Sequence, residues 1–407
     1  MIKRIKKSSK VSNKYEEATI VITVLICSVM IFFFPTSRQG TQRSVEYSLV
    51  NAAASAIVLL LLAFSKIKFN YGQLAIGVIL TIYLFIASLL VTIDSGIEAN
   101  IARIAPTIIS IIFLCADFSG IRKSKRSVLL LIDLIYVTII IVNLLIIINS
   151  ADIIEFLNQY YTQLDDYTAT YYSTLHNKPV FTFGVHNFAA YFYCILYIIS
   201  LVIYKYRKYR RYLAYTAALM AFTLLLNSAA SYITFYLMVL ILILSIDITR
   251  NQRILSISLI FVAVFGIAVY VYRTPELFER LFLSSTNGFG ARYLYGSNFY
   301  SGNFRMISLY PLGIGFTIMP SVYYADSGYI IYYTMGNFVM IGAVGVLLYR
   351  FLRINIYSKF TRNAILVSVL LAELSFSTIL YWKSMFLMIF MCIVIKCLAT
   401  EEVPQHS

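Results

Sequence analysis

Charged residues are scarce in this chain. Asp, Glu, Lys and Arg make up only 13% of its 407 residues, whereas 60% are hydrophobic. Soluble proteins carry about 25% charged residues, so this composition could not cover the surface of soluble domains of such length. The mean hydropathy of +0.81 also excludes intrinsic disorder, which requires low hydrophobicity. The composition therefore predicts a polytopic membrane protein.

Several cofactor and metal motifs are also absent. The chain has no Walker A loop, which excludes a P-loop ATPase, and no H-E-x-x-H sequence or Cys/His cluster for zinc. It has no D-x-D pair for metal-assisted sugar-nucleotide chemistry, so we expect neither a cofactor nor a metal. The five cysteines all fall in apolar runs, and we expect no disulfide between them.

Apolar runs long enough to cross a membrane recur along the whole chain, since a spanning helix needs about 20 such residues. We predict twelve spans: 18–34, 48–65, 71–93, 101–120, 127–149, 187–204, 212–227, 229–246, 254–272, 327–349, 363–380 and 382–398. The first run is too long for a signal-peptide core and lacks an A-x-A site, so we expect it to be retained. The chain is predicted to be one all-α transmembrane domain over 1–407.

The formal net charge of +15 could indicate a nucleic-acid partner, but the positions of the basic residues indicate topology instead. With both termini in the cytoplasm, the inside segments hold 24 of the 33 basic residues and seven of the 18 acidic ones. The outside segments hold nine basic and ten acidic residues, and Glu373 lies within a span. Every inside loop is then basic, as the positive-inside rule requires. We therefore expect no nucleic-acid partner.

Two connections are much longer than the others, at about 150–186 and 273–326, and both are predicted to lie outside. Long loops without a fold of their own are usually functional or disordered, and these are rich in Tyr and Phe. Aromatic rings suit the membrane interface and also stack on sugars. Segment 276–283 has its apolar residues on one helical face and is expected to lie in the interface. We predict that these loops form an active-site face.

The outer loops contain a small set of charged candidates. Arg292 and Arg305 could bind a diphosphate, because guanidinium groups match phosphate oxygens in a fork geometry. Asp326 and His186 could each take a proton from a hydroxyl. The alternative is that the arginines anchor lipid headgroups and that Asp326 caps a helix. No metal ligands are predicted among them.

Two sequence elements resemble the O-antigen polymerase and O-antigen ligase family (Wzy-type). TFGVHNFAAYF, in the stretch that begins at Lys178, looks like its G-T-F-x-x-x-N-x-x-A element, and PLGIGF followed by DSGYI looks like the glycine element after its catalytic loop. The resemblance covers about 175–350 and is closest to capsular polysaccharide repeat-unit polymerases. The family's ligases have His-Asn where Asp326-Ser327 stands, which favours a polymerase. Many members have Arg in place of Lys178.

The resemblance implies an activity, a substrate and a location. Members join oligosaccharide repeat units carried on polyprenyl diphosphate at the outer leaflet of the bacterial plasma membrane, and they release polyprenyl diphosphate. A flippase and a chain-length regulator would be partners, beside membrane lipids. A flippase or transporter of the same lipid-linked oligosaccharide, and an O-antigen-ligase-like transferase, are the alternatives.

The roles that follow are assigned to outer-face residues. Arg292 and Arg305 would bind the diphosphate with help from Lys178, and either Asp326 or His186 would activate the acceptor hydroxyl. Further substrate-binding candidates are Asn187, Tyr324, Arg103, Gly313 and Gly315. Glu373 stands apart, because a carboxylate within a span suggests either a function or a protonated group bonded to a neighbouring helix.

Overall fold

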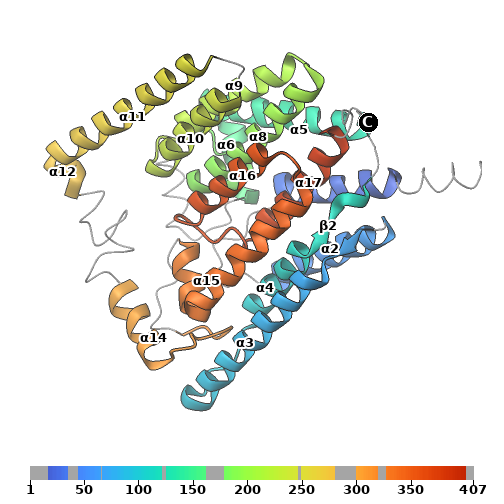
Figure 1. Cartoon of the computed structure of the whole chain (residues 1–407), viewed down its shortest axis with the longest axis vertical. Coiled ribbons are helices and arrows are strands. Elements are labelled where there is room, and N and C mark those ends of the chain that lie inside the picture. The colour runs from blue at the N-terminus through green and yellow to red at the C-terminus, as the bar shows by residue number, and fades with distance from the viewer. Residues whose placement is uncertain are drawn as a thin grey trace, which may run out of the picture.

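The computed structural model describes residues 17–34, 45–65, 67–121, 125–161, 178–245, 249–279, 299–319 and 327–399. Within these ranges the chain is almost entirely helical, so the predicted all-α class is confirmed (Figure 1). The helical elements are Glu17–Phe33 with its π-helical end η1 (Val29–Phe33), α2 (Val45–Phe64), α3 (Tyr71–Ser95), α4 (Ile101–Leu114), η2 (Phe118–Gly120), α5 (Lys125–Ile147), α6 (Ala151–Tyr161), η3 (Phe181–Phe183), α8 (His186–Arg207), α9 (Arg211–Leu225), α10 (Ala229–Ser245), α11 (Arg250–Arg273), α12 (Pro275–Phe278), η5 (Phe299–Phe304), α14 (Arg305–Leu309), α15 (Gly328–Asn355), α16 (Lys359–Ala372) and α17 (Trp382–Ala399).

Four of the described helices, α3, α5, α8 and α15, are long and apolar enough to cross a membrane. Others are apolar but shorter, such as α4 and α16 with 14 residues each. A helix of that length rises only about 21 Å, whereas the hydrocarbon core is about 30 Å thick. The apolar helices are those expected of a membrane protein, and the number of twelve spans stays a prediction.

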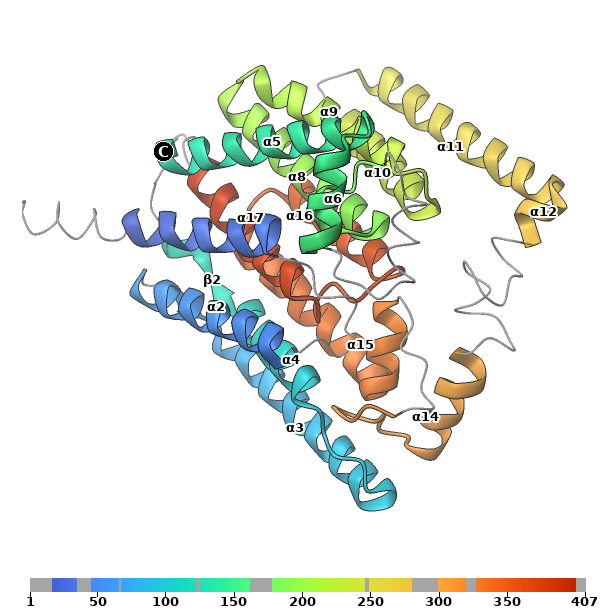
Figure 2. The ribbon, with the colours of Figure 1, turned by 180° about the vertical axis from the view of Figure 1, so that it is seen from behind.

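Helix α8 lies at the centre of the bundle, and every residue from Phe188 to Ile203 is buried. Its burial follows from its sequence, since it is apolar on all faces, and α9, α10, α16 and α17 pack around it. By contrast, α3 and α5 are only one-third buried and turn apolar residues outward, as helices do beside lipid. Helix α11 packs along α10 at the edge of the bundle (Figure 2).

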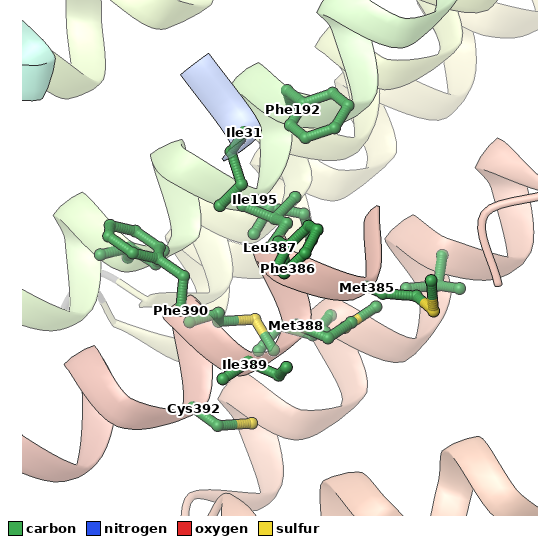
Figure 3. Close-up of a cluster of buried hydrophobic side chains, with 14 of the residues drawn as sticks. Ile31, Phe192, Ile195, Met385, Phe386, Leu387, Met388, Ile389, Phe390 and Cys392 are labelled. Atoms are coloured by element: carbon green, nitrogen blue, oxygen red, sulfur yellow. The ribbon is translucent and has the colours of Figure 1, made fainter. Parts of the chain in front are cut away.

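The largest block of core side chains is built by α17 against α8 and the first helix. Phe192 and Ile195 of α8 lie near Phe386 and Leu387 of α17, with Ile31 beside them (Figure 3). All five cysteines are buried and free, as predicted from their positions in apolar runs.

Contacts at one end of the bundle join segments that the charge pattern places inside. The two-residue strands β1 (Lys68–Phe69) and β2 (Ala116–Asp117) pair antiparallel. Asn355, at the end of α15, donates to the Ala116 carbonyl and accepts from the Phe118 amide. Arg211 of α9 forms an ion pair with Asp133 of α5 at 2.8 Å. We call this the inner end, and the opposite end the outer end.

Two helices are interrupted within predicted spans. Helix α15 has non-helical backbone angles at Gly336 and Asn337, so it consists of two segments joined at a kink. Helix α16 ends at Ala372, although the apolar run extends to residue 380, and an irregular turn over 373–381 leads into α17. Irregular backbone at membrane depth must be buried in protein or line a wet cavity, so both breaks deserve a structural account.

Candidate active site

The outer end of the bundle joins segments that lie far apart in the sequence. The Tyr310 hydroxyl donates to Asp94 at the end of α3, and Ala99 forms an isolated β-bridge with Thr317. The Arg103 guanidinium in α4 donates to the Thr317 carbonyl at 3.3 Å. Arg103, a predicted substrate-binding residue, therefore holds part of the second long loop in this structure.

The Pro311–Phe316 segment fills the kink of α15. The Ile314 amide donates to the Thr334 carbonyl at 3.0 Å, and the Gly315 amide donates to the Met335 carbonyl at 2.8 Å. The kink frees these carbonyls from their helical partners, and a buried carbonyl needs a donor. The side chain of Asn337 completes the contact by donating to the Pro311 carbonyl at 3.1 Å.

Both glycines of this segment, predicted to bind substrate, are required by backbone packing. Gly313 has φ +88°, and a Cβ there would lie 2.5 Å from the Met335 carbonyl oxygen. Gly315 has φ +58°, and a Cβ there would lie 2.3 Å from the Leu84 carbonyl oxygen and from Ser88 Oγ. Only glycine combines a positive φ with so close an approach. Their role in substrate binding stays a prediction.

Arg305 is the first residue of α14 and is exposed. Its guanidinium group is therefore accessible at the outer surface, as binding of a diphosphate requires. Arg292, Tyr324 and Asp326 lie outside the described residues, so the predicted diphosphate pair and the choice of base stay predictions.

Lys178, His186 and Asn187 lie together at the outer end of α8. The Lys178 ammonium donates to the Asn227 carbonyl at 3.4 Å, and its partial burial lowers the pKa of this side chain. His186 and Asn187 form the first turn of α8 and are half-buried. The structure thus brings the three residues of the TFGVHN element to the mouth of one helix.

A pocket of about 50 Å³ opens beside this first turn, between α8, α10 and α16. Asn187 and Tyr191 line it from α8, and Ala230 and Ile233 line it from α10. Its remaining side is formed by α16 and the residues that follow this helix, including Ser375.

The turn over 373–381 is organised by the carboxylate of Glu373, which is only 3% exposed. Its Oε1 accepts from the Tyr332 hydroxyl at 2.9 Å, from the Thr378 amide at 3.0 Å and from the Thr378 hydroxyl. Tyr332 in turn accepts from the Ser377 hydroxyl at 2.9 Å. The other carboxylate oxygen, Oε2, is buried without a hydrogen-bond partner among the described residues.

Glu373 also fixes the start of α15. The Gly328 amide donates to the Glu373 carbonyl at 2.8 Å, and the Ser327 hydroxyl donates to the same carbonyl at 3.3 Å. A Cβ on Gly328 would lie 1.5 Å from Glu373 Oε2, so only glycine fits beside the carboxylate. A negative charge here also favours the N-terminus of the helix. Because Ser327 follows Asp326 in the chain, the turn determines where the DSGY element enters the bundle.

The same turn packs against α8. The Phe188 ring stacks on Tyr381 with 4.7 Å between ring centroids and meets Phe376 edge-on at 4.3 Å. Phe188 follows Asn187 directly, so the turn contacts the TFGVHN element on one side and the DSGY element on the other. The charge pattern identified Glu373 as unusual, but this bridging role depends on contacts far apart in sequence.

Lys383 was not predicted as a site residue. It is 3% exposed in the first turn of α17, and its ammonium lies 5.8 Å from the centroid of the Phe183 ring. Its Nζ has no hydrogen-bond partner among the described residues. The only signal in the sequence was a lone lysine at the start of an apolar run. Among the described residues no group of His, Cys, Asp and Glu could hold a metal.

Comparisons of the chain with protein-family models, with curated proteins and with solved structures find no match. The resemblance to the O-antigen polymerase family therefore rests on the short motifs alone.

Proposed function

We propose that this protein is a membrane glycosyltransferase that polymerises oligosaccharide repeat units carried on polyprenyl diphosphate. The reaction takes place at the outer leaflet of a bacterial plasma membrane, as in capsule or O-antigen synthesis. Twelve spans with both termini inside place the two long loops on that side. The substrates are the lipid-linked oligosaccharides, and a flippase and a chain-length regulator would act with the enzyme.

One observation carries this proposal: the turn over 373–381 joins the two sequence elements on which the resemblance rests. Phe188, next to His186 and Asn187, packs on Phe376 and Tyr381 of the turn. Ser327 and Gly328, next to Asp326, bond to the turn through the Glu373 carbonyl. The two elements are about 140 residues apart in sequence, as expected of parts of one site.

In the proposed reaction, a hydroxyl oxygen of the acceptor repeat unit attacks the anomeric carbon of the donor chain. The new C–O bond forms as the bond between that carbon and the diphosphate oxygen breaks, and polyprenyl diphosphate leaves. His186 or Asp326 accepts the hydroxyl proton, which typically contributes a factor of about 10²–10⁴. Arg292 and Arg305 neutralise the diphosphate charge that develops, and Lys178 assists. Asn187, Arg103 and Tyr324 would position the sugars.

A flippase for the same lipid is the second candidate. A discontinuous helix such as α15, together with buried charges such as Glu373 and Lys383, is a feature of transporters. A ligase would use the same donor but would transfer one finished chain to a different acceptor. These activities differ in whether a glycosidic bond forms and in how many times.

The proposal is tested by polymer synthesis in cells that carry substituted proteins. Arg305→Ala and Arg292→Ala should abolish polymer while the protein still inserts, and Arg→Lys should also fail if the fork geometry is needed. Arg273→Ala, which removes an exposed basic residue from the end of α11, is the matched control and should leave polymer unchanged. Normal long polymer from both Arg305→Ala and Arg292→Ala would contradict the diphosphate assignment.

A further inference from the structure

The pocket between α8, α10 and α16 faces the side of the bundle rather than its end. Two residues that line it are largely exposed on that side: Ile233 of α10 is 51% exposed and Leu374, after α16, is 40% exposed. In a membrane protein, an exposed apolar side chain between helices faces lipid. A hydrocarbon chain could therefore enter the pocket sideways, without passing the polar outer loops.

The wall of the pocket changes character along its length. Asn187 and Ser375 lie at the outer end, where α8 begins and α16 has ended. Further in, the lining consists mainly of apolar side chains such as Leu237 and Leu371. Tyr191 forms the back wall, and its ring packs edge-on against Phe376 of the turn with 5.6 Å between centroids. The site therefore has a polar mouth and an apolar interior.

A cation is fixed close to this mouth. The Lys178 ammonium donates to the carbonyl of Asn227, which lies three residues before the pocket residue Ala230. Asn227 is itself held by the hydroxyl of Tyr232, which donates to its side chain at 2.6 Å. One polar face of this ammonium is engaged by the carbonyl, and its other hydrogens can donate to a further oxygen, since Lys carries three donors.

We infer that this pocket binds the isoprenoid chain of a polyprenyl phosphate lipid, with the phosphate at Lys178 and Asn187. The inference rests on the proposed function, because that lipid is the carrier of the proposed substrate. A phosphate complements the ammonium at the mouth, and an apolar chain complements the interior. A single chain suits a pocket this narrow better than the two chains of an ordinary phospholipid.

The pocket also fits the geometry of the proposed reaction. A phosphate at Lys178 would lie at the outer end of α8, beside the half-buried His186. The carrier lipid would thus be held with its chain in the membrane and its first sugar at the outer face, where a transfer reaction needs it.

The test is photo-crosslinking of the purified full-length protein in phosphatidylcholine nanodiscs with a polyprenyl monophosphate that carries a diazirine on its chain. Crosslinked peptides are expected from α10 and α16, and unlabelled polyprenyl phosphate should displace the probe. Displacement by phosphatidylglycerol at the same concentration would overturn the inference, because the pocket would then be a general lipid site.

Two substitutions in α10 give a matched pair. Ala230→Phe fills the pocket and should reduce crosslinking to background, whereas Ala229→Phe adds the same ring at an exposed neighbour outside the pocket and should not. The thermal unfolding temperature of both variants shows whether the fold is kept. A folded Ala230→Phe protein that is labelled as strongly as Ala229→Phe would overturn the inference.

The phosphate contact is tested by competition. Polyprenol, which lacks the phosphate, should compete about tenfold less well than polyprenyl phosphate, as expected for one charge-assisted hydrogen bond. Lys178→Gln should remove most of that difference. If polyprenol competes equally well in the unsubstituted protein, Lys178 does not bind the phosphate and the inference is wrong.

Failure of the inference can be told apart from failure of the proposed function. If Ala230→Phe polymerises repeat units normally and is labelled normally, the polymerase proposal stands and the pocket assignment falls. If the probe labels the pocket as expected but no polymer forms with any lipid-linked repeat unit, the lipid site stands and the polymerase proposal falls.

Discussion

The kink in α15 and the turn after α16 both interrupt helices at membrane depth, yet they satisfy their polar groups differently. At the kink, backbone amides of Ile314 and Gly315 pair with the freed carbonyls of Thr334 and Met335. At the turn, a side chain does this work, because Glu373 accepts from Tyr332 and Thr378. Only the turn leaves a buried charged group with an unpaired oxygen.

This difference separates architecture from a candidate function. A buried hydrogen bond contributes about 1 kcal/mol net, whereas a buried polar atom without a partner costs about 1–3 kcal/mol. The kink therefore needs no further explanation than packing. The turn keeps an energetically costly group next to both motif elements, and that position is where a functional constraint is expected.

The largest expected effect is at the kink. Gly315→Ala should destabilise the protein by about 3 kcal/mol or prevent folding, because it combines a left-handed backbone with a clash against Leu84 and Ser88. Thermal unfolding in detergent, followed by fluorescence-detected gel filtration, measures this. Gly342→Ala in α15 is the control, since a Cβ there meets nothing within 4 Å. Equal unfolding temperatures for both variants would refute the packing role of Gly315.

A double-mutant cycle probes the contact between Gly328 and Glu373. Gly328→Ala should cost about 2 kcal/mol, because the new methyl group overlaps Glu373 Oε2. In a Glu373→Ala background the same substitution should cost less than about 0.5 kcal/mol, because the space is then free. Unfolding temperatures of the four proteins give the coupling. Additive effects would show that the two residues do not press on each other.

A smaller effect is expected when only the charge of Glu373 is removed. Glu373→Gln keeps an oxygen that can accept from Tyr332 and Thr378, so stability should change by less than about 1 kcal/mol. Glu373→Ala loses both contacts and should cost about 2 kcal/mol. The comparison uses the same unfolding measurement. A Gln variant that is less stable than the Ala variant would mean that the negative charge itself is required.

The smallest effect on stability is expected at Arg305. Its side chain is exposed, so Arg305→Ala should shift the free energy of unfolding by no more than about 0.5 kcal/mol, as surface substitutions do. Polymer synthesis should nevertheless be lost. If the unfolding temperature of Arg305→Ala falls as far as that of Glu373→Ala, its loss of activity could not be assigned to the diphosphate.

Much of the fold could be predicted from the sequence, because long apolar runs identify helices directly. The runs 71–93, 127–149, 187–204 and 327–349 correspond to α3, α5, α8 and α15. The breaks could not be predicted, because each depends on partners far along the chain. The kink at Gly336 is filled by residues near 314, and Glu373 contacts Tyr332 of another helix.

The candidate site could be predicted only in part. The TFGVHN and DSGY elements were identified by resemblance, and the structure adds that one turn links them. Gly313 and Gly315 attracted attention as motif glycines, but their surroundings are explained by backbone packing. Lys383 was overlooked because a lysine at the end of a span usually reaches the interface, and its burial is visible only in three dimensions.

The central claim is that this protein joins lipid-linked repeat units, and synthesis by the purified protein tests it most directly. The protein would be reconstituted in liposomes with oligosaccharide repeat units on polyprenyl diphosphate, without ATP or added metal. The account predicts a ladder of products that differ by one repeat unit, together with released polyprenyl diphosphate. Movement of the lipid between leaflets with no new glycosidic bond, or a single transfer to a different acceptor, would contradict it.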